Sequence, residues 1–316
     1  MRRAMTETME DVPMKLAVTG HHGQLVQSLL EAAPAANVAI AALGRPAFDL
    51  SRLDQIGAAI AAQRPDCVVN AAAYTAVDNA ETNADAALLI NGAAAGALAA
   101  ACARLSIPII QISTDFVFDG AKSSPYLETD ATCPVSVYGA SKTLGEQLVA
   151  ASCPRHLILR TSWVISPFGH NFAKTMLRLG AERPKLTVVD DQHGSPTYAP
   201  HLAKAILSIA STMANAPVED QRWGLYHVTN TGETTWFGLA RDIFANAARY
   251  GAKVPDIEAI PTSAYPTPAR RPANSRLDGT KLTKAFGITL PRWQDGVRIC
   301  VDRLFAKSMS QKGAEQ

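Results

Sequence analysis

The chain has 316 residues, of which 47% are hydrophobic and 18% are charged. A chain of this length can bury one large core or two ordinary ones. The formal charge of +2 gives no reason to expect nucleic acid or an anionic membrane as a partner. Five cysteines without a C-x-x-C pair favour reduced thiols in the cytoplasm over a disulfide framework.

The first thirteen residues, MRRAMTETMEDVP, are polar and lack the apolar run of a signal peptide. We expect residues 1–13 to be a disordered extension and Met14 to be the functional start. No apolar run further along the chain is expected to reach membrane-spanning length.

From Lys15 onward, segments typical of strands alternate with segments typical of helices, including helices over residues 85–105 and 138–151. This order predicts βαβ units and a Rossmann-type, doubly wound parallel sheet. We assign residues 14–165 to a dinucleotide-binding domain. The expected strands are Lys15–Val18, Asn37–Leu43, Asp66–Asn70, Pro108–Ser113 and His156–Trp163.

After Trp163 the alternation of predicted strands and helices becomes less regular. Residues 166–316 are expected to form mainly a smaller substrate-binding lobe, partly interleaved with the first domain. GLYHV predicts a strand, which a turn at Gly232 joins to a helix with Thr234 as its N-cap. Residues 260–278 are rich in proline and too irregular for a helix.

The stretch AVTGHHGQLVQSLL, residues 17–30, runs from an apolar strand through Gly20 and Gly23 into an amphipathic helix. Such a turn lets backbone N–H groups approach a pyrophosphate at the helix start. Val26 stands where a third glycine would complete the usual spacing, and we expect it to shift the helix slightly without blocking the phosphates. Two glycines alone fit an ordinary tight turn equally well.

The second strand ends in Leu43, Gly44 and Arg45, without a carboxylate to bond a ribose 2′-hydroxyl. An arginine there suits a 2′-phosphate, which favours NADPH and leaves NADH allowed. Arg45 could also be an ordinary surface residue. Asp49, further along the loop, is expected nearer the adenine edge.

In VYGASK, Tyr138 and Lys142 lie four residues apart on a predicted helix and share one face. A free tyrosine titrates near about 10, and a neighbouring ammonium is expected to lower that pKa. Upstream, a strand ends in Ser113 and Thr114, whose hydroxyls can bond a carbonyl oxygen. A tyrosine–lysine pair recurs by chance in many helices, but this position favours a carbonyl reductase or a related sugar-nucleotide enzyme.

From Lys15 to about Arg298 the chain resembles the extended short-chain dehydrogenases, and within them the family of dTDP-4-dehydrorhamnose reductases. Six blocks in family order carry this resemblance: PDCVVNAAAYTAVDNAE, STDFVFDG, PVSVYGASKTLGE, RTSWV, VVDDQHGSPTY and RRPANSRLD. The resemblance implies reduction of dTDP-4-dehydro-L-rhamnose to dTDP-L-rhamnose by NAD(P)H, the last step of dTDP-L-rhamnose biosynthesis.

The resemblance also implies site residues. The catalytic set would be Thr114, Tyr138 and Lys142. Besides the last two, the cofactor would meet Gly20, Gly23, Gln24, Leu25, Arg45, Asp49, Leu50, Ala73, Tyr74 and Thr75. The substrate would meet Thr114, Asp115 and Trp163, with Arg271 and Arg276 able either to face its diphosphate or to pair with acids.

The chain departs from the family pattern outside the catalytic set. Besides Val26, Phe116 replaces a tyrosine, Ser136 an asparagine and Ile165 a frequent tyrosine, which bears on substrate affinity and specificity. Some family members hold magnesium at a dimer interface through a glutamate, and Ser28 occupies that place here. We therefore assign no metal ligand, and leave a magnesium requirement and a homodimer open.

Two other functions stay open. The chain could be a reductase or epimerase of another sugar nucleotide, in which an epimerase would retain NAD tightly. It also resembles the regulatory subunit of methionine adenosyltransferase, a binding partner without catalysis. The intact tyrosine, lysine and threonine weigh against that function, although a fold alone does not fix one.

Overall fold

A computed structural model describes residues 13–314 of the chain, with side chains as far as residue 307. The expected N-terminal extension lies outside the described residues except for Pro13. The first strand begins at Met14.

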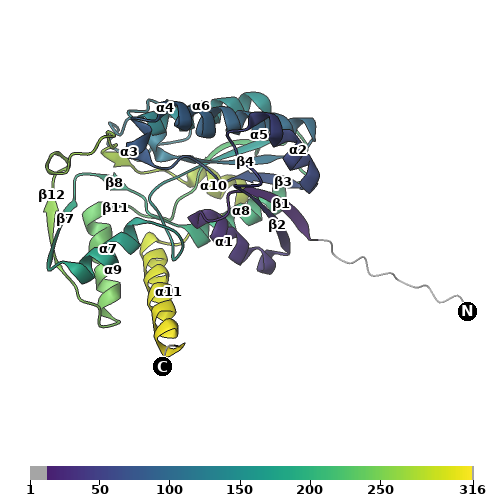
Figure 1. Ribbon diagram of the computed structural model, residues 1–316. Coiled ribbons are helices and arrows are strands. Elements are labelled where there is room, and N and C mark those ends of the chain that lie inside the picture. The colour runs from purple at the N-terminus through teal and green to yellow at the C-terminus, as the bar shows by residue number, and fades with distance from the viewer. Residues whose placement is uncertain (1–12, 315–316) are drawn as a thin grey trace, which may run out of the picture.

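A six-stranded parallel sheet forms the centre of the protein, with the strand order β10-β5-β4-β3-β1-β2 (Figure 1). The order reverses between β1 and β3, which makes the sheet doubly wound and confirms the Rossmann-type prediction. Its strands are β1 (Met14–Thr19), β2 (Val38–Leu43), β3 (Cys67–Asn70), β4 (Ile109–Thr114), β5 (His156–Thr161) and β10 (Gly224–His227).

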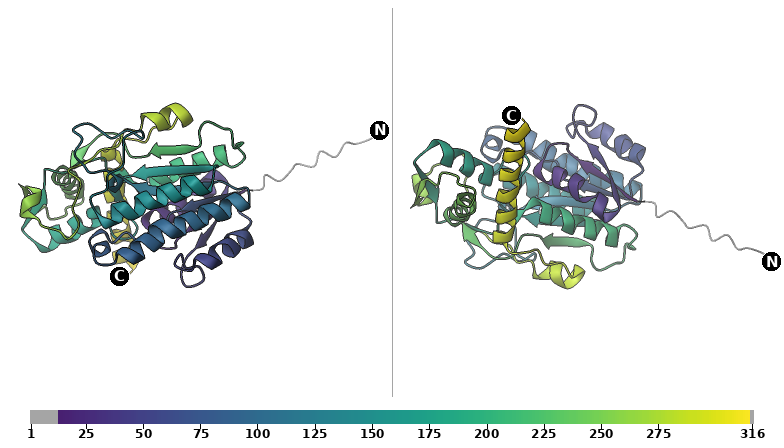
Figure 2. Two further views of the ribbon diagram at one scale, coloured as in Figure 1. Left: turned by 90° about the horizontal axis from the view of Figure 1, so that it is seen from above. Right: turned by 90° about the horizontal axis from the view of Figure 1, so that it is seen from below.

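Two apolar layers cover the two faces of the sheet, so its central strands are buried on both sides. One face is covered by α1 (Gln24–Ala32), α8 (Ala199–Met213) and α10 (Thr280–Phe286). The other face carries α2 (Leu53–Gln63), α5 (Ala94–Arg104) and α6 (Val137–Ser152). The two further views show these layers on opposite sides of the sheet (Figure 2).

The expected helix over residues 85–105 consists of α4 (Ala84–Ala87), the π-helical segment η2 (Leu88–Ala93) and α5. The expectation that no apolar run reaches membrane-spanning length is wrong. The helical segment Ala84–Arg104 is long and apolar enough to cross a membrane, judged by length and composition alone. The same segment packs against α2 and α6, and 56% of its apolar window is buried inside the protein. It is therefore a helix of the core, in the layer that covers one face of the sheet.

A second cluster of elements lies beyond the carboxyl ends of the strands, around its own apolar core (Figure 1). Its helices are α7 (Phe172–Glu182), α9 (Trp236–Ala248) and α11 (Trp293–Ala314). Its strands are β6 (Val164–Ile165), β7 (Lys185–Val189), β8 (His193–Gly194), β9 (Thr197–Tyr198), β11 (Thr234–Thr235), β12 (Asp256–Ile260) and β13 (Asn274–Ser275). Between these elements the chain returns to the sheet through α8 and β10, so the two parts share the C-terminal half of the sequence.

Short helical turns complete the described chain: η1 (Pro34–Ala36), α3 (Val77–Ala80), η3 (Asp115–Val117) and η4 (Thr262–Ala264). Several boundaries differ from expectation by one residue, and two differences have a clear structural reason. The strand expected over His156–Trp163 ends at Thr161, because Trp163 adopts a left-handed φ of 47° that no strand accommodates. Helix α9 is capped by Thr235, whose hydroxyl accepts from the Gly238 N–H, and not by Thr234.

Candidate active site

The glycine loop joins β1 to α1 and leaves the first amide groups of the helix free. Gly20 has a φ of 100°, which L side chains rarely adopt, and its N–H donates to the carbonyl of Leu43 at 2.6 Å. Gly23 is the N-cap of α1, and no side chain caps this helix. Free N–H groups at a helix start attract anions, so the loop fits the pyrophosphate of a dinucleotide.

The residues after the second glycine point in different directions. Val26 is buried in the core beneath the loop, where its Cγ2 would lie 3.3 Å from a Cβ at Gly20. Leu25 is also buried. The Gln24 amide oxygen accepts from the Ser166 hydroxyl at 2.9 Å, which ties the start of α1 to the segment after β6.

At the end of β2, the imidazole of His21 packs against the backbone of Gly44; a Cβ there would lie 2.6 Å from the ring. Arg45 follows as an exposed side chain. Asp49 accepts from the Ser51 N–H at 2.9 Å, and this hydrogen bond lowers its pKa. Leu50 is buried, which leaves its backbone and not its side chain for contacts with a ligand.

A chain of buried hydrogen bonds crosses the sheet at the carboxyl ends of its central strands. The Thr19 hydroxyl donates to the side-chain oxygen of Asn70 at 2.7 Å, and the Asn70 amide donates to the side-chain oxygen of Gln111, also at 2.7 Å. The amide of Gln111 donates to the carbonyl of Ile112, which also accepts from the Lys142 ammonium at 2.6 Å. This chain links the strand that carries the glycine loop to Lys142.

Asn91, which the sequence analysis did not single out, fixes the turn after β3. It accepts from the backbone N–H of Tyr74 at 2.8 Å and donates to the Tyr74 carbonyl at 3.0 Å and to the Ser141 hydroxyl at 2.9 Å. Ala73 and Thr75 flank Tyr74 in this turn. A buried asparagine in an alanine-rich helix was the available signal, and its π-helical segment belongs to a class frequent at functional sites.

The structure brings Thr114, Tyr138 and Lys142 together at the junction of β4 and α6. The Thr114 hydroxyl donates to Asp115 at 2.9 Å, accepts from the Phe116 N–H at 3.2 Å and lies beside the phenol of Tyr138, whose pKa it acts to lower. Lys142 lies one helical turn after Tyr138 and is only 4% exposed. The three residue types expected for carbonyl reduction therefore meet at one edge of the sheet.

Burial is the main cause that raises the pKa of Tyr138 to about 12, and the Asp115 carboxylate adds to it. The expectation that Lys142 lowers this pKa is therefore wrong: the ammonium is held by the Ile112 carbonyl. Burial lowers the pKa of Lys142 itself to about 8, against an opposing effect of Glu146. At neutral pH the phenol is protonated, as a proton donor has to be.

Asp115 is 2% exposed, and burial raises its pKa to about 6. Hydrogen bonds from Ser275 and Thr114 oppose this shift by stabilising the charged form. Ser275 lies on β13, so the substrate lobe reaches the end of β4 here.

Trp163 stacks on Trp236, with ring centroids 3.6 Å apart and an interplanar angle of 10°. On β8, Gly194 makes room for the indole, since a Cβ there would lie 2.3 Å from Trp163 Cε2. The pair forms an aromatic wall of the lobe. Trp236 was missed in the sequence because it reads as an ordinary first residue of a helix.

The two arginines considered for the substrate both pair with acids. Arg271 contacts Asp78 at 2.7 Å, and Arg276 contacts Glu233 at 3.0 Å. The alternative left open for them in the sequence, pairing with acids, is the one found in the structure.

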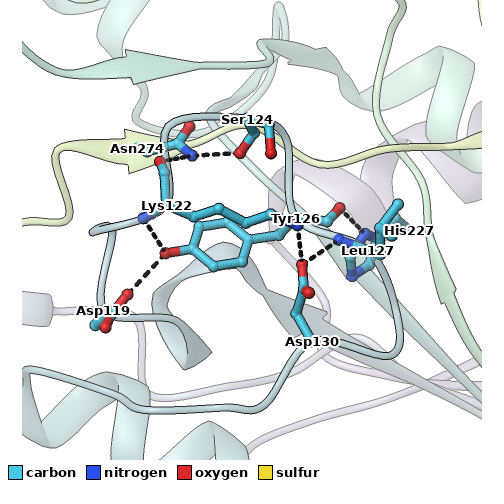
Figure 3. A network of polar contacts seen from close by, with 8 residues as sticks. All are labelled: Asp119, Lys122, Ser124, Tyr126, Leu127, Asp130, His227 and Asn274. Atoms are coloured by element: carbon cyan, nitrogen blue, oxygen red, sulfur yellow. Dashed lines mark hydrogen bonds and ion pairs between the residues drawn. The ribbon is translucent and has the colours of Figure 1, made fainter.

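The loop between β4 and α6 is held to the substrate lobe by a polar network (Figure 3). Tyr126 stacks on Phe118 at 4.0 Å, and its hydroxyl donates to Asp119 at 2.7 Å. Asn274, also missed in the sequence, donates to the carbonyls of Lys122 and Ser124. These contacts fix the part of the loop between Phe118 and Tyr126.

The family departures have clear structural places. Phe116 packs edge-on against Tyr138, with centroids 5.6 Å apart. Ser136 caps α6 by accepting from the Gly139 N–H at 3.1 Å. Ile165 is buried, and Ser28 donates to the Gln24 carbonyl. Among the described residues, no group of three or more His, Cys, Asp or Glu side chains could hold a metal ion.

Comparisons with known proteins agree with this geometry. The protein-family model named RmlD substrate binding domain matches residues 14–306 of the chain. The dTDP-4-dehydrorhamnose reductase of Sinorhizobium fredii is 46% identical over 90% of this chain and 96% of its own, and that of Burkholderia thailandensis is 44% identical over 93% and 100%.

Solved structures of the same kind superpose over nearly the whole chain. The dTDP-4-dehydrorhamnose reductase of Clostridium acetobutylicum has a TM-score of 0.85 at 33% identity, covering 92% of this chain and 99% of its own. That of Bacillus anthracis, solved in complex with NADP, has a TM-score of 0.82 at 33% identity, covering 93% and 99%. The chain belongs to the dTDP-4-dehydrorhamnose reductase family.

Proposed function

We propose that this chain transfers a hydride from NADPH to C4 of dTDP-4-dehydro-L-rhamnose and so forms dTDP-L-rhamnose, the last step of dTDP-L-rhamnose biosynthesis. The observation that carries the proposal is the meeting of Thr114, Tyr138 and Lys142 beside a free glycine loop, in a chain of this family. The reduced thiols of the five cysteines favour the cytoplasm as its location.

Reduction of a ketone needs a hydride and a proton, and the bound nicotinamide supplies the hydride. Tyr138 holds the proton at its phenol oxygen and gives it to the developing alkoxide. The Thr114 hydroxyl donates its single proton to Asp115 in the free protein, and it would turn that proton to the substrate oxygen when the ketone binds. Lys142, one helical turn after Tyr138, would anchor the nicotinamide ribose.

The dinucleotide would be held by the glycine loop, by the backbone around Asp49 and Leu50, and by the turn at Ala73, Tyr74 and Thr75. Arg45 is exposed and has no carboxylate next to it in the chain, which supports NADPH over NADH. We assign no residue to magnesium.

For the sugar nucleotide, Trp163 would line the nucleotide end and Asp115 would meet the sugar. Arg271 would face the diphosphate after exchanging its partly exposed pair with Asp78 for the ligand. Exposed ion pairs contribute little to stability, about 0–1 kcal/mol, so such an exchange costs little.

The test is loss of reduced-nicotinamide absorbance with enzymatically generated dTDP-4-dehydro-L-rhamnose, with NADPH and NADH in parallel. Tyr138→Phe should lower kcat by roughly a hundred- to ten-thousand-fold and leave NADPH binding nearly intact, because only the proton donor is lost. Normal turnover in this variant would refute the mechanism.

Two results would point to the other functions. Tight cofactor retention without oxidation would indicate an epimerase of another sugar nucleotide. Absence of any reductase activity, together with co-purification of an S-adenosylmethionine synthetase, would indicate the regulatory subunit.

A further inference from the structure

A line of buried charges continues from the active site along α6 toward β5. Tyr138, Lys142 and Glu146 follow one another at intervals of four residues, so their side chains leave the same face of the helix. Both Lys142 and Glu146 are buried in the described structure. A buried charge is costly unless an opposite charge lies near it.

Glu146 is held by two hydrogen bonds from β5. Its carboxylate oxygens accept from Nε and Nη2 of Arg160, at 2.8 and 2.6 Å. The two side chains are only 8% and 4% exposed, and the guanidinium lies over the ring of Phe118 at 4.9 Å. A forked, buried pair of this kind fixes the position of the carboxylate.

The neighbouring His227 does not share this charge. Burial, together with Arg160, lowers the pKa of His227 to about 3, so the imidazole is neutral at physiological pH. Glu146 is therefore the carboxylate that neutralises the charge of Arg160, and it lies one helical turn after Lys142 on α6.

The remaining surroundings of Lys142 contain few charges. Tyr138 is neutral, and Asp115 lies beyond it on η3. Strand β4 and segment η2 contain no charged residue. Four charged residues lie on the other helices packed against α6. Asp78 on α3 pairs with Arg271, and Glu81 at the end of α3 accepts from the Val137 N–H. Asp85 on α4 is exposed, and Arg104 lies in the last turn of α5.

We propose that Glu146, clamped by Arg160, is a positioning residue that keeps the buried Lys142 ammonium charged during the reaction. The inference rests on the proposed function for its catalytic meaning, but the charge relation itself belongs to the free protein. The lowered pKa of Lys142, which Glu146 opposes, fits this relation. Without the carboxylate, burial would act on the ammonium unopposed.

The first measurement is the titration of Lys142 in the protein without ligand. Lysine labelled with ¹³C at Cε gives a signal for each side chain, and Lys142→Met assigns the signal of interest. In Glu146→Gln, the midpoint of this titration should fall by roughly one to two pH units, because a charge one helical turn away has been removed. Glu31→Gln, which breaks the exposed pair with Arg303, should leave the midpoint unchanged.

A second variant guards against loss of the fold, since Glu146→Gln leaves Arg160 buried and unpaired. The double variant Glu146→Gln/Arg160→Met removes both charges, and such replacements are often neutral or stabilising. Its Lys142 midpoint should lie between those of Glu146→Gln and the unaltered protein, because the more distant positive charge is also gone.

The second measurement is the pH profile of kcat/KM for the reduction, which reports groups of the free enzyme. Its alkaline limb should move to lower pH in both variants, in step with the Lys142 midpoint. Folded variants with an unchanged Lys142 midpoint would overturn the inference and leave the pair a purely structural role. A shifted midpoint in a protein that does not reduce the sugar nucleotide would refute the proposed function alone.

Discussion

Asn91 and Tyr74 are joined by two hydrogen bonds, in which the asparagine side chain accepts from the Tyr74 N–H and donates to the Tyr74 carbonyl. The same amide bonds Ser141 on α6, one residue before Lys142. One side chain thus fixes both the turn expected to follow the cofactor and the helix that carries Tyr138 and Lys142.

We expect Asn91→Ala to lower the free energy of unfolding by about 1–3 kcal/mol, since it leaves buried polar groups without partners. It should also weaken NADPH binding, because the turn at Tyr74 is released. Chemical denaturation and NADPH fluorescence measure the two effects. Asn246→Ala on α9 is the control, and equal losses of NADPH affinity in both variants would contradict this role.

Gly20→Ala tests the glycine loop. The positive φ of Gly20 should cost alanine roughly 1–2 kcal/mol of stability, and the added Cβ would press on Val26. Gly251 also has a positive φ, of 70°, but an added Cβ there meets nothing within 4 Å. Both alanine variants should lose stability, and only Gly20→Ala should raise the Kd for NADPH, by about tenfold or more. An unchanged Kd would show that the loop does not hold the pyrophosphate.

Gly194→Ala tests the aromatic wall. The new Cβ would overlap Trp163, so the indole and its partner Trp236 have to move. We expect a higher KM for the sugar nucleotide, a nearly unchanged Kd for NADPH and a shifted tryptophan fluorescence maximum. Gly57→Ala on α2, where the Cβ meets only the end of Arg104, is the matched control. An unaltered KM despite the fluorescence shift would remove Trp163 from the substrate site.

Asp115 makes a prediction about stability and pH. Its folded pKa of about 6 lies above the ordinary aspartate value of 3.8, so the folded protein holds this proton more tightly than the unfolded chain. The associated stabilisation is fully present below pH 3.8 and is lost as the pH rises through 6. Asp115→Asn should therefore stabilise the protein at pH 7, by about 1–3 kcal/mol, and the gain should shrink toward pH 4.

Asp119 has a lowered pKa and is therefore expected to show the opposite dependence of stability on pH. A hydrogen bond from the Ala121 N–H is the main cause that lowers the pKa of Asp119. Its contribution to stability is therefore present above the ordinary aspartate pKa of 3.8 and is lost as the pH falls further. Asp119→Asn should reduce stability at pH 7. Urea denaturation across this pH range measures both variants, and a destabilised Asp115→Asn would show that the charged carboxylate is needed for the fold.

The sequence predicted the sheet from local patterns, and it predicted the candidate catalytic set from the resemblance to the family. Apolar runs mark the parallel strands, and a spacing of four residues places Tyr138 and Lys142 on one helix face whatever surrounds them. Boundaries that depend on backbone strain, such as the end of β5 before Trp163, could not be predicted this way.

The residues that the sequence analysis missed have partners far away in the chain. Asn91 looks like an interruption in an alanine-rich helix until Tyr74 and Ser141 meet it. Trp236 becomes the partner of Trp163 only when the fold brings the start of α9 against the turn after β5. No local pattern contains these pairs.

The sequence by itself determined the doubly wound fold and the placement of Tyr138 and Lys142 on one helix face, because periodicity and spacing act within a few residues. The choice of Thr114 as their partner came from the resemblance to the family. Tertiary structure decided the charges: Arg271 is paired with Asp78, and Glu146 with Arg160. It also decided that burial raises the pKa of Tyr138, where the sequence favoured a decrease. Burial and ion pairing are properties of distant segments brought together, so only the folded chain fixes them.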